Sequence, residues 1–115
     1  DCVFCKIVSG EQNSEKIFES ENFIGFLDIS PVSEGHTLII PKKHYATILD
    51  MPDELGNELV GLIKKRGGEL VSQKEGNGFN VVQSNFKSAQ QEVEHLHFHI
   101  VPRSEGDGIR YRYRD

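Results

Sequence analysis

Three histidines alternate with apolar residues near the C-terminal end of the chain. The string HLHFHIV contains His95, His97 and His99, separated by Leu96 and Phe98. Successive side chains of a β-strand point to opposite faces, so in a strand the three imidazoles lie on one face, with neighbours about 6.6 Å apart. The apolar side chains then enter the core. One histidine on a strand is commonly structural, but three in alternation favour a functional site.

Two chemistries fit such a row of imidazoles. In the first, the three rings bind one zinc ion and leave a coordination position open for water. In the second, one neutral imidazole is a nucleophile toward phosphorus, and its neighbours supply protons and charge. The spacing alone is compatible with both chemistries.

A second candidate site is the CxxC pair formed by Cys2 and Cys5, which are the two cysteines of the chain. An isolated CxxC is compatible with zinc binding, with redox chemistry or with no function. Two cysteines cannot provide the disulfide framework of a small secreted protein. We therefore expect a reducing, cytoplasmic location.

The rest of the sequence predicts the elements that position these residues. Apolar residues at helical spacing, followed by Gly10, predict a short N-terminal helix. Strands are predicted from alternating or β-branched runs at residues 16–19, 22–28, 36–40, 79–83 and 96–101. Pro41 and Pro102 are predicted to end the third and the last of these strands, because proline cannot continue a central ladder.

One amphipathic helix is predicted between the third and fourth strands. Pro52 and the two acidic residues after it are typical of a helix start, and leucines at three-to-four spacing continue to about residue 71 or 72. Gly67 and Gly68 should weaken its middle, by roughly 1 kcal/mol each relative to alanine. Strands without regular strand–helix alternation indicate the α+β class, with an antiparallel sheet of about five strands packed against one main helix.

Length and charge exclude several classes of protein. The 115 residues, 37% of them hydrophobic, suffice for a single core. No apolar run approaches the ~20 residues that span a bilayer. Thirteen basic residues against eighteen acidic ones give a net charge of −5, which makes nucleic acid an unlikely main partner.

The motifs taken together resemble those of the histidine-triad (HIT) family. HLHFHIV resembles its alternating histidines, GHTLIIPKKH at residues 35–44 its second signature, and CVFCKIVSG with FLDISPVS its N-terminal half. The similarity extends from residue 2 to about residue 103, which suggests a HIT domain at 1–103 and a C-terminal tail at 104–115. The resemblance implies an α+β protomer in a homodimer and a bacterial-type, Hint-like nucleotide hydrolase without an organic cofactor.

The resemblance also implies roles for individual residues. His97 would attack the α-phosphate and carry the nucleotide covalently, and His99 would contact the phosphate oxygens. His36 would orient the histidines, and Gln91 would hydrogen-bond the phosphate or the leaving group. A histidine at the position of His99, where a transferase branch has glutamine, favours hydrolysis.

A nucleoside pocket is implied as well. Asp28 would accept hydrogen bonds from the ribose hydroxyls, although an aspartate after a strand is also a common turn residue. The base would lie among Val3, Phe4, Ile7, Phe26 and Leu27. Each of these apolar residues taken singly is more typical of a core.

By the same resemblance, Cys2, Cys5, His44 and His95 match a structural zinc site. Two thiolates and two imidazoles make a closed tetrahedral set without a water position. This site would occupy His95 and leave His97 and His99 for catalysis. The alternative is a reduced, metal-free CxxC pair.

The loop before the histidines departs from the family pattern. Ser84 replaces a usual asparagine, and Phe86 and Gln90 replace glycines. Glycine allows backbone amides to approach a phosphate and permits positive φ. We therefore expect a reshaped phosphate loop, to which Glu92 adds a negative charge, while Ser84 still contacts the substrate.

The sequence thus predicts a hydrolase of purine nucleotide phosphoramidates such as AMP-lysine, with AMP as ligand or product. A dinucleoside polyphosphate hydrolase and a nucleotide-binding regulator with reduced catalysis are the alternatives. The Arg- and Tyr-rich tail is compatible with nucleic acid stacking, but the acidic chain favours a dimer edge or disorder.

Overall fold

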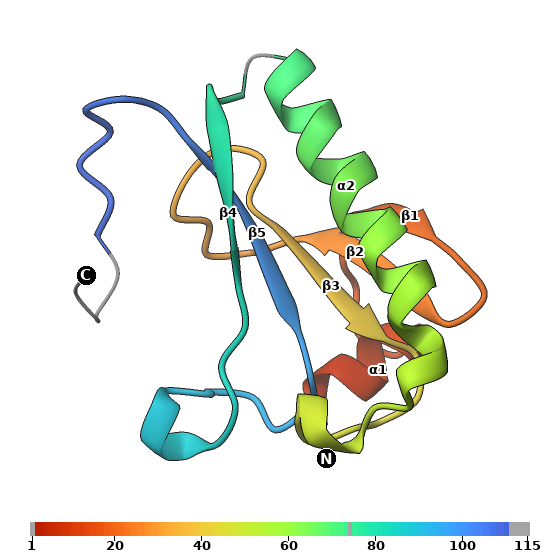
Figure 1. The fold of residues 1–115 in the computed structure, drawn as a ribbon. Coiled ribbons are helices and arrows are strands. Elements are labelled where there is room, and N and C mark those ends of the chain that lie inside the picture. Colours follow the sequence, from red (N-terminus) through yellow and green to blue (C-terminus); the bar gives the residue numbers. More distant parts are fainter. Residues whose placement is uncertain (1, 74, 111–115) are drawn as a thin grey trace.

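A five-stranded antiparallel sheet runs through the centre of the protein. A computed structural model describes residues 2–73 and 75–110. It places the strands in the order β1-β2-β3-β5-β4 (Figure 1). The strands are β1 (Lys16–Glu19), β2 (Phe23–Leu27), β3 (Thr37–Pro41), β4 (Gly78–Val82) and β5 (Phe98–Arg103). The predicted α+β class with one main helix is confirmed.

Different elements cover the two faces of the sheet. The main helix α2 (Gly56–Ser72) packs on one face, in an apolar cluster of Phe23, Ile39, Leu59, Leu70, Leu96, Phe98 and Ile100. The short helix α1 (Val3–Ser9) packs on the other face, in a cluster of Phe4, Ile24, Phe26, Leu38 and Ile40. Successive strand residues point to opposite faces. All five residues of β3, including Thr37, are therefore buried, on both faces of the sheet.

The main helix begins later than predicted. Pro52 precedes a 3₁₀ turn, η2 (Asp53–Leu55), and α2 itself starts at Gly56. A 3₁₀ turn is common at the start of an α-helix because its tighter hydrogen bonds satisfy terminal groups. The two other short turns are η1 (Ile48–Asp50) and η3 (Lys87–Ala89). Across the described residues, no helix is both long and apolar enough to cross a bilayer.

The last strand, β5, also differs from its predicted range of 96–101. It includes Pro102, which pairs with Phe79 of β4. The Pro102 carbonyl oxygen accepts a hydrogen bond from Ser33 Oγ (2.8 Å), beyond the last pair of β3 and β5. In a strand, the N–H and the C=O of one residue point to the same side. The N–H that proline lacks would therefore point away from β4, and no hydrogen bond to β4 is lost. Proline is therefore tolerated inside this strand, as it is at Pro41, the last residue of β3.

The histidine segment enters the sheet at Phe98. His95 and His97 precede β5, because the Leu96 N–H donates to the carbonyl of Tyr45 (2.7 Å) and not to a ladder partner. The predicted alternation still holds for the apolar residues, since Leu96 and Phe98 both belong to the cluster under α2. The imidazoles are thereby directed to the opposite side of the chain.

Gly67 and Gly68 have different surroundings within α2. A Cβ atom at Gly67 would overlap the ring of Phe79, a residue of β4. A Cβ atom at Gly68 would meet no atom within 4 Å. The first glycine is thus required for the close approach of helix and strand, whereas the second is not.

These surroundings predict opposite effects of two alanine substitutions. Gly68→Ala should raise the free energy of unfolding by about 0.5–1 kcal/mol, because alanine is the better helix former. Gly67→Ala gains the same propensity but displaces the Phe79 ring, so it should be the less stable of the two. Urea unfolding of both variants measures the difference, and equal stabilisation would contradict the packing of Phe79 on α2.

Candidate functional site

The side chains predicted to bind a nucleotide gather around one cleft of about 600 Å³. The cleft is lined by Val3, Phe4, Ile7, Phe26, Asp28, His36, Ser84, His97 and His99. Of the other predicted substrate residues, Leu27 and Gln91 do not line it. The four predicted metal ligands form a separate group outside the cleft.

The apolar wall of the cleft comes from α1 and β2. The rings of Phe4 and Phe26 meet edge to face, with centroids 5.8 Å apart. The Phe4 ring also contacts the imidazole of His97, at 5.2 Å between centroids. This wall is suited to a planar aromatic ligand close to His97.

Asp28 follows β2 and lies where the wall becomes polar. Its Oδ1 accepts a hydrogen bond from the backbone N–H of Ser30 (2.9 Å), which is the turn role that its position predicts. Its Oδ2 lies 3.5 Å from His36 Nε2 and is on the cleft side of the chain. Asp28 therefore serves the turn and also presents an acceptor to the cleft.

His97 has one ring nitrogen committed to the backbone. Its Nδ1 lies 2.7 Å from the carbonyl oxygen of His95, and a carbonyl can only accept, so Nδ1 carries the proton. The lone pair of the neutral ring is then on Nε2. Burial lowers the pKa of His97, so the neutral form prevails near pH 7. These are the properties of a nitrogen nucleophile.

His36 and His99 form a hydrogen-bonded pair beside His97. The backbone N–H of Val32 donates to His36 Nδ1 (3.2 Å), so the proton of the neutral His36 ring is on Nε2. His36 Nε2 then donates to His99 Nδ1 (2.9 Å), which leaves the proton of His99 on its own Nε2. His99 is thereby held as a hydrogen-bond donor.

The pair is neutral at physiological pH. Burial, together with the neighbouring His97 and His36 rings, lowers the pKa of His99 to about 4. Burial also lowers the pKa of His36, against the opposing effect of Asp28. Asp28, His36 and His99 are close enough to hold an ion. The proton on His36 Nε2, however, occupies the position that a metal would need, so this group is better explained as a hydrogen-bonded one.

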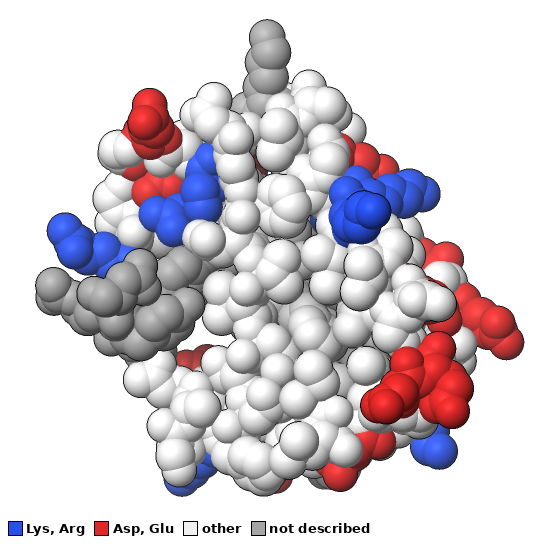
Figure 2. All heavy atoms as spheres, viewed as in Figure 1, with Lys and Arg blue, Asp and Glu red and all other residues white. Residues whose placement is uncertain are grey.

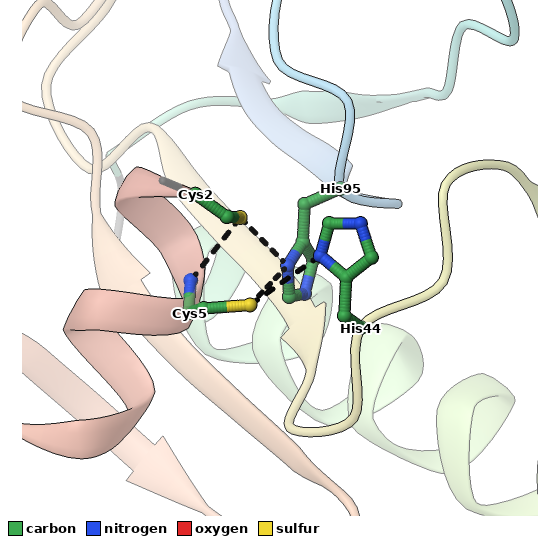
Figure 3. A group of neighbouring side chains, drawn as sticks. All are labelled: Cys2, Cys5, His44 and His95. Carbon is green, nitrogen blue, oxygen red and sulfur yellow. Dashed lines mark hydrogen bonds between the residues drawn. The ribbon is translucent and has the colours of Figure 1, made fainter.

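A separate cluster joins Cys2, Cys5, His44 and His95, whose donor atoms all lie within 4.8 Å of one another (Figure 3). His95 Nδ1 lies 3.2 Å from Cys2 Sγ and 3.6 Å from Cys5 Sγ, and His44 Nδ1 lies 3.3 Å from Cys5 Sγ. Cys2 caps α1, because its sulfur accepts the backbone N–H of Cys5 (3.3 Å). The start of α1 is thus brought against the loop after β3 and the segment before β5.

The chemistry of this cluster fits a metal ion. His95 Nε2 lies 2.9 Å from the carbonyl oxygen of Pro41, so Nε2 carries the proton and the Nδ1 lone pair faces the two sulfurs. Without an ion, burial and the Cys2 thiol raise the pKa of Cys5. A cation would reverse that effect and hold both thiolates. Two sulfurs and two imidazole nitrogens are the ligand set that zinc prefers.

Gln91 has a different place from the predicted one. Its Oε1 accepts the backbone N–H of Phe86 (2.7 Å), and its Nε2 donates to the carbonyls of Ala46 (2.6 Å) and Val93 (3.1 Å). The side chain is buried and all its polar atoms bind backbone. The prediction of a contact with phosphate is therefore not met, and Gln91 instead holds the loop that precedes the histidines.

Sequence reasoning expected Glu92 in the loop beside the substrate, but it assigned no substrate contact to Gln90 or Arg110 in this cleft. Gln90, and not Gln91, lines it, as does Glu92. The Glu92 carboxylate is close enough to raise the pKa values of His97 and His99, against the larger effect of burial. Arg110 also lines the cleft. The departures at the loop pointed to this region, but no motif indicated Arg110.

The chain is similar to known proteins in sequence and in fold. The HIT domain matches residues 9–106. The chain is 47% identical over 109 residues to an uncharacterised HIT-like protein of Methanocaldococcus jannaschii, covering 93% of this chain and 82% of that protein. It is 41% identical over 108 residues to the adenosine 5'-monophosphoramidase HNT1 of Candida albicans, covering 90% and 71%.

A solved structure shows the same fold. The crystal structure of a Zn-bound histidine triad family protein from Mycobacterium smegmatis superposes with a TM-score of 0.90 at 38% identity, covering 99% of this chain and 83% of that one. Motifs, fold and sequence similarity therefore converge, and the chain belongs to the HIT family.

Proposed function

We propose that the protein hydrolyses purine nucleotide conjugates at the α-phosphate, with nucleoside phosphoramidates such as AMP-lysine as substrates. The observation that carries the proposal is the hydrogen bond from His97 Nδ1 to the His95 carbonyl, which leaves Nε2 as a nucleophile inside the cleft. The similarity to an adenosine 5'-monophosphoramidase supports the same reaction.

The arrangement of the cleft suggests how a nucleotide is bound. The base lies against the Phe4 and Phe26 wall, and the ribose hydroxyls donate to Asp28. The α-phosphate then meets His97, and the Nε2–H of His99 donates to a phosphate oxygen. The His36–His99 hydrogen bond keeps that donor in place before the substrate arrives.

The reaction proceeds in two displacements. His97 Nε2 bonds to phosphorus as the bond to the leaving nitrogen breaks, and the nitrogen, protonated from solvent beforehand, departs as a neutral amine. Water then attacks the nucleotidyl–His97 phosphorus, the Nε2–phosphorus bond breaks, and its electron pair returns to the ring. The proton released by water replaces the one taken from solvent. AMP is the product.

The carboxylate of Glu92 favours this substrate class over dinucleoside polyphosphates. Glu92 lines the cleft and acts electrostatically on His97 and His99. A carboxylate near the reacting phosphate repels a polyphosphate leaving group more strongly than an amine. A dinucleoside polyphosphate hydrolase is therefore the second candidate.

A covalent intermediate tests the proposal. Mixing the protein with an adenosine phosphoramidate and quenching in the first turnover should yield a chain heavier by one adenylyl group, attached at His97 by peptide mass spectrometry. His97→Ala should form no adduct and lose roughly 10³-fold or more in kcat, yet still bind AMP in calorimetry. AMP binding by the wild-type chain with neither adduct nor turnover would instead establish a nucleotide-binding regulator.

We also propose that Cys2, Cys5, His44 and His95 hold a structural zinc ion. The donor geometry of the cluster and the similarity to a Zn-bound family member support it. Such a closed set offers no position for substrate and serves to fasten α1, which carries Phe4, to the sheet. The thiolates must stay reduced to bind the ion, which is consistent with the expected cytoplasmic location.

Elemental analysis distinguishes this site from a zinc ion on the histidine triad. Purified wild-type protein should contain one zinc per chain, and His97→Ala should retain it because His97 is not a ligand. Cys5→Ser should lose most of the zinc and lower the melting temperature. Zinc that disappears from His97→Ala but stays in Cys5→Ser would place the ion on the triad.

We propose, finally, that two protomers associate through α2 and β4. The edge strand β4 and the adjacent helix expose apolar side chains at Val60, Val71, Phe79 and Val81. Figure 2 shows that charged residues lie mainly around the margin of this face and leave its centre uncharged. An exposed edge strand beside an apolar patch is typical of an interface.

A charge placed on this face should separate the protomers. Val81 is 46% exposed and Leu49, on η1, is 78% exposed, so neither change disturbs a core. Sedimentation velocity should show a dimer for the wild-type chain and for Leu49→Glu, and a monomer for Val81→Glu. A monomeric wild-type chain at micromolar concentration would contradict the proposed interface.

A further inference from the structure

The loop between β4 and the histidine segment holds two residues in strained backbone conformations. Phe86 has φ 73° and ψ 157°, and Gln90 has φ 72° and ψ 31°. These are the two described non-glycine residues with positive φ. The conformation of Phe86 is one that glycine alone adopts readily, and that of Gln90 is left-handed. Strain of this kind persists only where the surroundings impose it.

The surrounding hydrogen bonds impose this geometry. The Gln91 side chain ties the N–H of Phe86 to the carbonyls of Ala46 and Val93. Within the loop, the Gln90 N–H donates to the carbonyl of Lys87 (2.8 Å), and the Gln91 N–H donates to that of Phe86 (3.1 Å). The backbone path is therefore set independently of the side chains at positions 86 and 90, and glycine would follow it with less strain.

The side chains of the two strained residues differ in their position relative to the cleft. Gln90 lines the cleft together with Ser84 and Glu92, whereas Phe86 does not line it and is 56% exposed. Among the described residues, no side-chain hydrogen bond engages the Gln90 carboxamide. A donor and an acceptor at the cleft are thus available to a ligand.

The sheet order places Gln90 away from the nucleoside. The wall that would hold the base comes from α1 and β2, whereas the loop with Gln90 follows β4. In the order β2-β3-β5-β4, these two sides flank β5, which carries His99. A nucleotide with its base on the first side and its phosphorus at His97 therefore directs its remaining substituent toward Gln90.

We infer that Gln90 is a specificity-determining residue that hydrogen-bonds the leaving group. This inference rests on the proposed nucleotidyl transfer to His97. Glycine would adopt the left-handed backbone of position 90 with less strain, whereas glutamine adds a hydrogen-bonding side chain to the cleft. Together with the carboxylate of Glu92, the carboxamide selects amine leaving groups that carry a further polar group, such as an amide, over plain alkylamines.

Two AMP phosphoramidates test the inference, one of n-propylamine and one of β-alanine amide. Gln90→Gly should lower kcat/KM for the amide-bearing substrate by roughly five- to tenfold, the value of one lost hydrogen bond, and change the propylamine substrate by less than about twofold. Phe86→Gly is the matched control, because it relieves backbone strain outside the cleft and should leave the ratio of the two substrates unchanged. Comparing ratios cancels the intrinsic reactivities of the amines.

Two further measurements separate the effect from a general disturbance of the loop. Both glycine variants should raise the melting temperature by a few degrees, and AMP affinity should stay within about twofold of the wild-type value. Gln90→Asn, which tolerates left-handed φ and keeps a carboxamide, should recover part of the preference.

The outcomes are distinguishable from a failure of the proposed function. A wild-type chain that forms no nucleotidyl–His97 adduct would overturn both. If the adduct forms but Gln90→Gly slows both substrates equally, or Phe86→Gly changes the ratio as much, only the role of Gln90 is overturned. A change in the ratio confined to Gln90→Gly supports it.

Discussion

The hydrogen bond between His97 Nδ1 and the carbonyl oxygen of His95 is the interaction on which the rest of the site depends. It determines which nitrogen of His97 is free. It also links the cleft to the Cys2, Cys5, His44 and His95 cluster, because His95 belongs to that cluster and holds His97. The ring of His95 is fully buried and faces the sulfurs of Cys2 and Cys5, while its backbone serves His97. A displacement of His95 therefore affects both the proposed metal site and the proposed nucleophile.

The N-terminal helix extends this coupling to the nucleoside wall. Phe4 lies between the two cysteines in sequence, and its ring contacts both His95 and His97. Whatever fastens the start of α1 to the sheet also positions Phe4 against the cleft. A helix of seven residues is too short to be stable alone, so these tertiary contacts and the Cys2 cap are what hold it.

A second constraint acts on the loop after β4. Gln91 places its amide on three backbone groups and thereby imposes positive φ on two neighbours that are not glycines. The strained backbone belongs to the loop whose residues Gln90 and Glu92 line the cleft. The structure thus places one departure from the family pattern, Gln90, at the cleft and another, Phe86, outside it.

Local patterns in the sequence were sufficient for most of the elements, whereas the spacing of the histidines alone left two chemistries open. Alternation in HLHFHIV separates the apolar residues from the imidazoles, and the spacing of leucines marks α2, because both depend only on the periodicity of the backbone. The ends of elements were less accurate. Pro102 lies within β5 because its nitrogen points to the side of β3, beyond the last residue pair of β3 and β5. The length of a neighbouring strand cannot be read from the local sequence.

The sequence alone determined that histidines and cysteines of suitable type were present at suitable spacing, since residue identity and periodicity are local properties. Spacing left their division open and the family resemblance implied it, whereas the tertiary structure shows the contacts: His95 with the thiols, His97 with a backbone carbonyl, and His99 with His36. It also decided that Gln90 and not its neighbour faces the cleft. Hydrogen-bond partners set these choices, and the partners come from segments tens of residues away, whose positions no local pattern specifies.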